Sequence, residues 1–214
     1  MWYYNYSDDN AAGSWPLSYR QNNANNVAWY FEDKGWTINA ISAMLGNMQF
    51  ESYLNPGQWE LNRGVEGYEE HGYGLVQWTK WTKYTNWAEE RGYNWRTTFT
   101  PQLERIQWEL ENGVQWQSVL WHGMTFREFS QSYDAVATLT EAFLRAYENP
   151  QNPSGSLRRR VEFAEYWYSY FTGQSPTPPT PGPDVPTPGP GPTPSGTNKF
   201  KIMFYLKPKW KRGL

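Results

Sequence analysis

The sequence predicts a mainly α (α+β) fold: a helical domain with a loop-rich or small β insertion, then a proline-rich linker and a short basic tail. Apolar residues recur at helical spacing across residues 21–173, and residues typical of helix ends bound most of these stretches. Glycine is dense between residues 51 and 77, which interrupts the helical pattern. Ten prolines lie within residues 174–198, a composition that cannot build a core.

The individual helices are predicted by apolar spacing and by the residues at their ends. Apolar side chains follow i, i+3, i+4 and i+7 spacing from Ala24, and this helix should end near Lys34. Thr37 suits the N-cap of a second helix, whose inward side continues to Ser52 and which Asn55-Pro56-Gly57 stops. A third helix should follow Thr79 and stop at Gly92, and a fourth should begin at Thr100-Pro101 and stop at Gly113. Two more should begin at T-x-x-E capping boxes, over Thr125–Glu128 and Thr138–Glu141. The last should run from about 157 to 171 and stop at Gly173.

These shifts in composition divide the chain into four parts. Residues 1–20 form an N-terminal arm, residues 21–173 the helical domain, residues 174–198 a Pro/Gly/Thr-rich linker and residues 199–214 a basic aromatic segment. The first residues lack the basic start and apolar stretch of a signal peptide, so we expect none. No window approaches the roughly 18 apolar residues of a membrane span, and we expect none of these either.

Composition excludes several function classes. Residues 1–173 contain 13 Lys and Arg against 20 Asp and Glu, so we expect no nucleic-acid binding by this part. There is no cysteine, and His71 and His122 lack the spacing of a zinc site, so we expect neither a metal nor another cofactor. The 14 Trp, 16 Tyr and 10 Phe should fill the core and also line a groove for sugars.

Glu51 is the first candidate for chemistry. It lies near the predicted C-terminal end of the second helix, where the partial negative charge of the helix disfavours a carboxylate. Its neighbours Met48 and Phe50 would remove water from it. Both effects favour the protonated form that a general acid requires. The structural alternative is an ordinary solvated glutamate at a helix end.

Two further elements share a motif pattern with Glu51. The first is a glycine turn, and the second is a Tyr late in a helix; alone, each is also consistent with an ordinary turn or core position. Taken in order, the three resemble the E-S, G-L-M-Q and A-Y-N motifs of goose-type lysozymes and lytic transglycosylases. The surrounding residues resemble the phage tail lysozyme family in particular. The stretches that carry the resemblance are Met44–Ser52, Gly72–Thr79, Ala146-Tyr147, Gly35-Trp36-Thr37, Asn55-Pro56 and Ala164–Trp167.

The resemblance covers about residues 21–172 and implies a lysozyme-like fold. It implies cleavage of the β-1,4 bond between N-acetylmuramic acid and N-acetylglucosamine in bacterial peptidoglycan, with Glu51 as the general acid. Val76 replaces the Met of the broader pattern, and Glu148 stands where that pattern has Asn. The implied substrate-contacting or supporting residues are Ser52, Tyr73, Gly74, Gln77, Trp78 and Tyr147.

A second carboxylate would decide the mechanism. An inverting hydrolase needs a base roughly 6.5–9.5 Å from the acid, with room for water. Glu60, Glu66, Glu69 and Glu70 precede the glycine turn, and we favour Glu69 or Glu70 because they come immediately before it. A solvated acidic loop is the alternative. A lytic transglycosylase needs no second carboxylate, because the muramic acid 6-hydroxyl attacks internally.

The C-terminal segment mixes basic and aromatic residues over residues 199–214. We expect it to contact other phage tail proteins or anionic wall polymers, ahead of a membrane surface. The expected location is a phage tail or, after release, the bacterial cell wall. The competing function is a non-catalytic glycan-binding or structural tail module that keeps the lysozyme shape.

Overall fold

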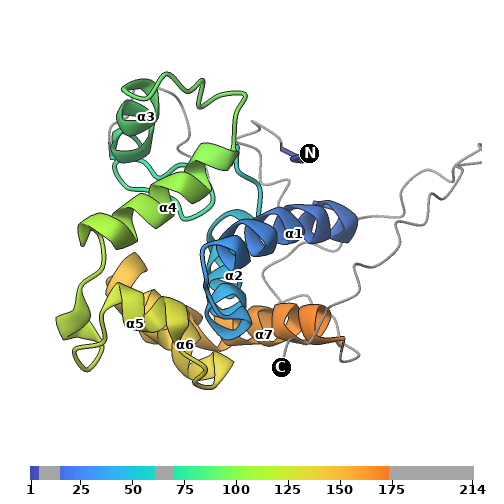
Figure 1. Ribbon diagram of the computed structural model, residues 1–214, viewed down its shortest axis with the longest axis vertical. Coiled ribbons are helices and arrows are strands. Elements are labelled where there is room, and N and C mark those ends of the chain that lie inside the picture. Colours follow the sequence, from blue (N-terminus) through green and yellow to red (C-terminus); the bar gives the residue numbers. More distant parts are fainter. Residues whose placement is uncertain (5–14, 61–69, 174–214) are drawn as a thin grey trace, which may run out of the picture.

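The computed structural model describes residues 1–4, 15–60 and 70–173. The predicted mainly α fold is confirmed (Figure 1). The elements are α1 (Leu17–Asp33), α2 (Ile38–Ser52), α3 (Thr82–Glu89), α4 (Thr100–Asn112), η2 (Ser118–Leu120), α5 (Phe126–Gln131), α6 (Val136–Phe143), η3 (Leu144–Glu148) and α7 (Pro153–Thr172). The predicted linker and basic segment lie outside the described residues. No helix within the described ranges is long and apolar enough to cross a bilayer.

Helix α2 is the centre of the domain. Residues on all of its sides are buried: the consecutive residues Ala43, Met44 and Leu45, which point in different directions, have no exposed surface. A helix that is apolar all round is buried by its neighbours, and α2 contacts α1, α5, α6 and α7. In Figure 1, α2 lies between α1, α7 and the α5–α6 pair, while α3 and α4 form a separate group above it. Glu51 therefore extends from the end of the most deeply held element of the fold.

A close approach between α2 and α7 depends on Gly46. A Cβ at this position would lie 2.5 Å from the Arg160 carbonyl oxygen and 2.6 Å from the Ala164 Cβ. Any side chain would force the two helices apart. The glycine thus sets Arg160 beside the last turns of α2.

The segment between α2 and α3 was predicted to be loop-rich or to hold a small β structure. In the part of it that the structure describes, a single antiparallel bridge joins Trp59 to Tyr73. Tyr73 is fully buried and packs against Trp59, Tyr84 and Trp95, with ring centroids 4.7–6.2 Å apart. Aromatic packing therefore takes the place of a strand ladder in holding this segment against α3 and α4.

Several predicted helix ends are confirmed. Thr37 caps α2 by accepting a hydrogen bond from the Ala40 amide, and Thr125 and Glu128 form a complete capping box. Gly113 and Gly173 end α4 and α7 in the left-handed conformation. These ends are local signals, because the capping group lies within a few residues of the amide or carbonyl that it serves.

Helix α1 begins at Leu17, ahead of the apolar spacing that starts at Ala24; its exposed first turn carries no such spacing. Two predicted starts are wrong, and each has a local reason. Helix α6 begins at Val136 rather than at a Thr138 cap, since Glu141 pairs with Arg145 at 2.8 Å and does not reach back. Helix α7 begins at Pro153, where Asn152 accepts from the Gly155 amide.

Candidate active site

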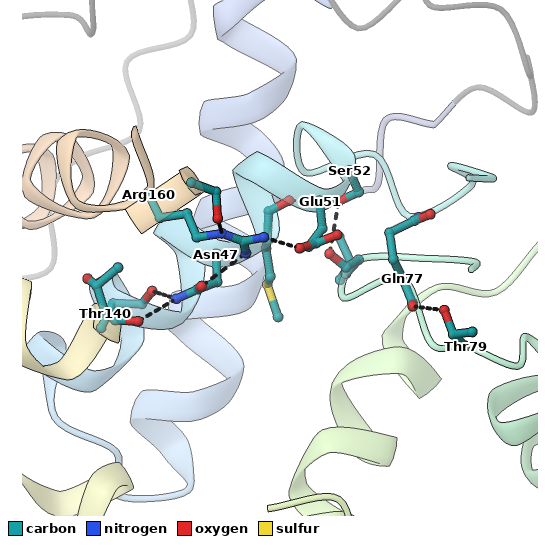
Figure 2. Close-up of polar contacts among 11 residues, drawn as sticks. Asn47, Glu51, Ser52, Gln77, Thr79, Thr140 and Arg160 are labelled. Carbon is teal, nitrogen blue, oxygen red and sulfur yellow. Dashed lines mark hydrogen bonds and ion pairs between the residues drawn. The ribbon is translucent and has the colours of Figure 1, made fainter. Parts of the chain in front are cut away.

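Glu51 is the penultimate residue of α2, and its side chain remains 22% exposed. Tyr53, in the left-handed conformation, ends the helix two residues later. The Glu51 carboxylate accepts a hydrogen bond from Nη2 of Arg160 on α7, an ion pair that Figure 2 shows. Glu51 thus has a cationic partner in addition to the helix end and the apolar neighbours that the sequence indicated.

Arg160 is held in place by three further contacts. Its Nη1 donates to Asn47 Oδ1 and its Nε donates to Ser156 Oγ, both at 3.0 Å. Asn47 in turn donates to the Thr140 carbonyl at 3.2 Å (Figure 2), and the Phe50 ring lies 4.2 Å from the Arg160 guanidinium carbon. Because the Arg160 side chain is only 3% exposed, the pair with Glu51 is shielded from bulk water.

The glycine turn meets the end of α2 through Ser52. This residue is fully buried, and its hydroxyl lies 3.0 Å from the Leu75 carbonyl and 2.9 Å from the Met48 carbonyl. Gly74 has a φ of +84°, and a Cβ there would lie 2.7 Å from Gln102 Oε1. The structure therefore brings Glu51-Ser52 and the turn over residues 74–77 together, as their order in the resemblance implied.

Gln102 of α4 holds the same turn from the other side. Its Oε1 accepts from the Leu75 amide at 2.8 Å, and its Nε2 donates to the Pro56 carbonyl at 2.7 Å. The Gln77 carboxamide donates to the Gly74 and Gln58 carbonyls at 2.8 and 3.0 Å. The Leu75 amide and the Gly74 carbonyl are thus held by the Gln102 and Gln77 side chains, each of which makes a second hydrogen bond elsewhere.

A polar cleft of about 210 Å³ opens beside the turn. Gln77, Trp78 and Tyr147 line it, the last two almost fully buried, whereas the fully buried Ser52 and Tyr73 do not. Glu51 and Gly74 are not among the lining residues. The lining consists of residues 76–79, Lys83, Gln115, Gln117 and residues 147–149.

A buried carboxylate, Glu109 of α4, supports the wall of the cleft. It accepts hydrogen bonds from Tyr147 Oη at 2.5 Å, Arg105 Nε at 2.8 Å and Trp78 Nε1 at 3.1 Å. Burial raises the pKa of Glu109, and these three donors oppose that rise. Burial, together with the Glu109 carboxylate, holds the pKa of the Tyr147 phenol well above its usual value. The structure therefore places the Tyr147 hydroxyl on Glu109, while the resemblance implied a supporting role near Glu51.

Glu148 lines the cleft next to Tyr147, at the end of the π-helical segment η3. It is half-buried, and its Oε1 is fully buried without a hydrogen-bond partner. Burial raises the pKa of this carboxyl well above its ordinary value; the Glu51 carboxylate adds to the rise, and Arg160 opposes it. A second carboxyl group thus lines the cleft at the position where the broader motif has Asn.

The acidic residues singled out before the turn have different surroundings. Glu60 Oε2 accepts from the Gly72 amide at 3.0 Å, which closes the bridge between the two segments. Glu70 is exposed and forms an ion pair with Lys80 at 2.5 Å. Glu66 and Glu69 lie outside the described residues. Neither Glu60 nor Glu70 belongs to the described lining of the cleft.

Two residues of the site were not foreseen, although the sequence holds a signal for both. Arg160 stands three and seven residues before the buried Phe163 and Trp167, so it occupies an inward position of its helix. Glu109 stands three residues after the buried Ile106 on the inward side of α4. A charged residue at an inward helix position requires a buried partner, and such a residue is therefore a candidate for a site.

The fold and the site together define a mainly α, lysozyme-like domain with a polar cleft beside the end of its central helix. The chain belongs to the phage tail lysozyme family, whose model matches residues 22–171. It is also 44% identical over 155 residues to Morphogenesis protein 1 of Bacillus phage B103. That match covers 72% of this chain and 40% of the relative, so the chain spans well under half of the relative's length.

Proposed function

We propose that this domain cleaves the β-1,4 bond between N-acetylmuramic acid and N-acetylglucosamine in bacterial peptidoglycan, with Glu51 as the general acid. The observation that carries the proposal is the junction that Ser52 makes between the end of α2 and the turn over residues 74–77. It joins the helix that carries Glu51 to a turn whose residues 76 and 77 line a polar cleft. Membership of the phage tail lysozyme family supports the same substrate.

In this proposal the Glu51 proton passes to the glycosidic oxygen as the bond from that oxygen to C1 of muramic acid breaks. Water can then add its hydroxyl to C1 and lose its second proton to a base, which leaves reducing-end muramic acid. Alternatively, the muramic acid 6-hydroxyl adds to C1, loses its proton and yields a 1,6-anhydro product. Glu69 and Glu70 stay proposals for a base, and mass spectrometry of the released fragments separates the two routes.

The cleft residues are proposed to hold the glycan. Gln77, Trp78 and Tyr147 line the cleft; Gln77 is half-buried, and Trp78 and Tyr147 are almost fully buried. Ser52, Tyr73 and Gly74 act from beneath by fixing the shape of the turn. We propose that the enzyme works at the bacterial cell wall, as part of a phage tail or after release, with residues 199–214 as a contact for tail proteins or wall polymers.

The test is the release of soluble fragments from purified cell walls by wild type and by Glu51→Gln. We expect the variant to fold and to lose about 10²–10⁴-fold in rate, the usual contribution of a general acid. Glu162→Gln is the matched control, because Glu162 is a carboxylate of α7 that pairs with Arg159. Release at the wild-type rate by Glu51→Gln would show that Glu51 is not the acid.

One observation favours a second candidate, a glycan-binding or structural tail module without activity. Arg160 neutralises Glu51, an arrangement that also serves a purely structural ion pair. A protein of this kind would sediment with cell walls and release no fragments, and Glu51→Gln would leave its binding unchanged. Wall binding and fragment release measured on the same samples distinguish the two candidates.

A further inference from the structure

Three short segments that are far apart in the chain line most of the polar cleft. They are the turn over residues 76–79, the loop that carries Gln115 and Gln117, and the end of η3 over residues 147–149. Each segment holds one non-glycine residue with a positive φ: Gln77 at +48°, Gln115 at +69° and Asn149 at +47°. Such backbone persists only where the surrounding structure enforces it, and it is frequent at ligand sites. The shape of the lining is therefore imposed by what lies behind it.

The buried carboxylate of Glu109 joins two of these segments from inside the protein. Trp78 of the turn donates its indole N–H to Glu109 at 3.1 Å, and Tyr147 of η3 donates its hydroxyl to the other carboxylate oxygen at 2.5 Å. Trp78 is 2% exposed and Tyr147 is 1% exposed, while Glu109 has no exposed surface. The polar side-chain atoms of Trp78 and Tyr147 are thus committed to this carboxylate rather than to a ligand.

The third segment is fastened to the end of η3. Gln115 donates a carboxamide N–H to the Tyr147 carbonyl at 3.0 Å, and the Gln117 amide donates to the Ala146 carbonyl at 2.7 Å. Tyr147 is therefore held at its hydroxyl by Glu109 and at its carbonyl by Gln115. All three segments take their positions from one connected set of hydrogen bonds.

Glu109 is itself fixed from the side away from the cleft. Arg105, one turn earlier on α4, donates its Nε to Glu109 at 2.8 Å. The Arg105 guanidinium carbon lies 4.5 Å from the centroid of the Trp108 ring and 5.6 Å from that of Trp87. A carboxylate with a cationic partner forms short, directional hydrogen bonds, so it is a rigid point of attachment for both of its aromatic donors.

We propose that Glu109 is a positioning residue for glycan binding, which holds the turn over residues 76–79 and the end of η3 at the separation that a glycan strand requires. It acts through the buried Trp78 and Tyr147 and does not touch the ligand itself. The ligand class, a strand of alternating N-acetylglucosamine and N-acetylmuramic acid, rests on the proposed function.

This role separates affinity from chemistry. The lining residues with more exposed surface, among them Gln77, Glu148 and Asn149, make the ligand contacts that depend on Glu109. Glu51 is held from elsewhere, by Arg160 of α7. Loss of the Glu109 carboxylate should therefore weaken binding and leave the rate at saturating substrate nearly unchanged.

The first test measures binding of soluble glycan strands, free of stem peptides and wall polymers, by calorimetry in the Glu51→Gln protein. Adding Glu109→Gln or Tyr147→Phe should raise Kd by about 10-fold or more, the equivalent of one hydrogen bond to a charged group. Tyr147→Phe keeps the ring and removes only the bond to Glu109. The two changes together should weaken binding by less than the product of the single losses, because the two residues form one bond.

Glu104→Gln and Tyr93→Phe, each added to the same Glu51→Gln protein, are the matched controls. Glu104 lies on the same helix as Glu109 and accepts the Tyr93 hydroxyl at 2.6 Å. Neither residue belongs to the described lining of the cleft. Each control should bind the strands with a Kd within about twofold of the Glu51→Gln protein, as expected for a distant site.

The second test uses the same strands and proteins that retain Glu51. Glu109→Gln should raise KM by the factor seen in Kd and keep kcat within about twofold of wild type, the signature of lost ground-state binding. A purely structural role would instead lower kcat with the folded fraction and leave KM unchanged. Thermal unfolding of each variant gives that folded fraction, and Tyr147→Phe carries both tests if Glu109→Gln does not fold.

Unchanged Kd and KM in the folded variants would overturn the positioning role, and so would fully multiplicative losses in the double variant. No measurable binding of the strands by the Glu51→Gln protein would overturn it as well. Fragment release by Glu51→Gln at the wild-type rate would refute the proposed general acid instead, and the comparison of KM values would still decide the role of Glu109.

Discussion

Gly46→Ala tests whether the spacing between α2 and α7 holds the site together. An added Cβ would lie 2.5 Å from the Arg160 carbonyl oxygen, 2.6 Å from the Ala164 Cβ and 2.8 Å from the Ala164 amide nitrogen. Two of these atoms are backbone, so one helix must move as a body. Overpacking of this kind costs about 1–3 kcal/mol, and the upper end applies because neither helix can yield locally.

The substitution also has a favourable part, which must be subtracted. Alanine is better than glycine in a helix interior by about 1 kcal/mol. The net expected loss in the free energy of unfolding is therefore about 2 kcal/mol, which corresponds to a Tm lower by roughly 4–8 °C for a chain of this size. Movement of α7 also draws Arg160 away from Glu51, so the rate of fragment release should fall with the stability.

The assay is thermal and urea unfolding followed by circular dichroism. Gly155→Ala is the matched control, since a Cβ there meets only the Asn152 side chain, at 3.2 Å, and that side chain can adjust. Its Tm should stay within about 2 °C of wild type, because substitutions away from strained sites change stability by roughly 0.5 kcal/mol or less. A Gly46→Ala protein as stable as wild type would refute the argument from helix spacing.

Three further predictions follow from buried polar groups. Ser52→Ala removes the hydroxyl that meets the Leu75 carbonyl and should cost about 1–3 kcal/mol in urea unfolding; an unchanged midpoint would contradict this. Tyr147→Phe removes a donor to buried Glu109 and should cost about 1.5–3 kcal/mol in urea unfolding; unaltered stability would show that this bond contributes nothing. Because the pKa of Glu148 is raised in the folded protein, the folded protein keeps a proton that the unfolded chain loses above about pH 4.3. The contribution of this group to the free energy of unfolding therefore declines as the pH rises from there toward the folded-state pKa. The free energy of unfolding should accordingly fall more steeply with pH in wild type than in Glu148→Gln, by up to about 1.36 kcal/mol per pH unit, and parallel curves would contradict this.

The local features of this domain could be read from its sequence. Thr37, Gly113 and the capping box at Thr125 mark helix ends because each acts within a few residues of the group that it satisfies. The start of α1 has no such local mark, because its exposed first turn carries no apolar period. Glu51 and the turn over residues 74–77 were also apparent, because their residue types and order form a motif.

The environment of Glu51 was decided by the tertiary structure. Arg160 lies 109 residues along the chain from Glu51, Gln102 lies 27 residues from Leu75, and both contacts exist only once α2, α4 and α7 have packed. No local pattern specifies which buried charge meets which partner, because the packing angle and spacing of whole helices set that choice. The sequence by itself determined the fold class and the candidate acid, whereas the protonation of the site depends on how many charges the packed helices bring together.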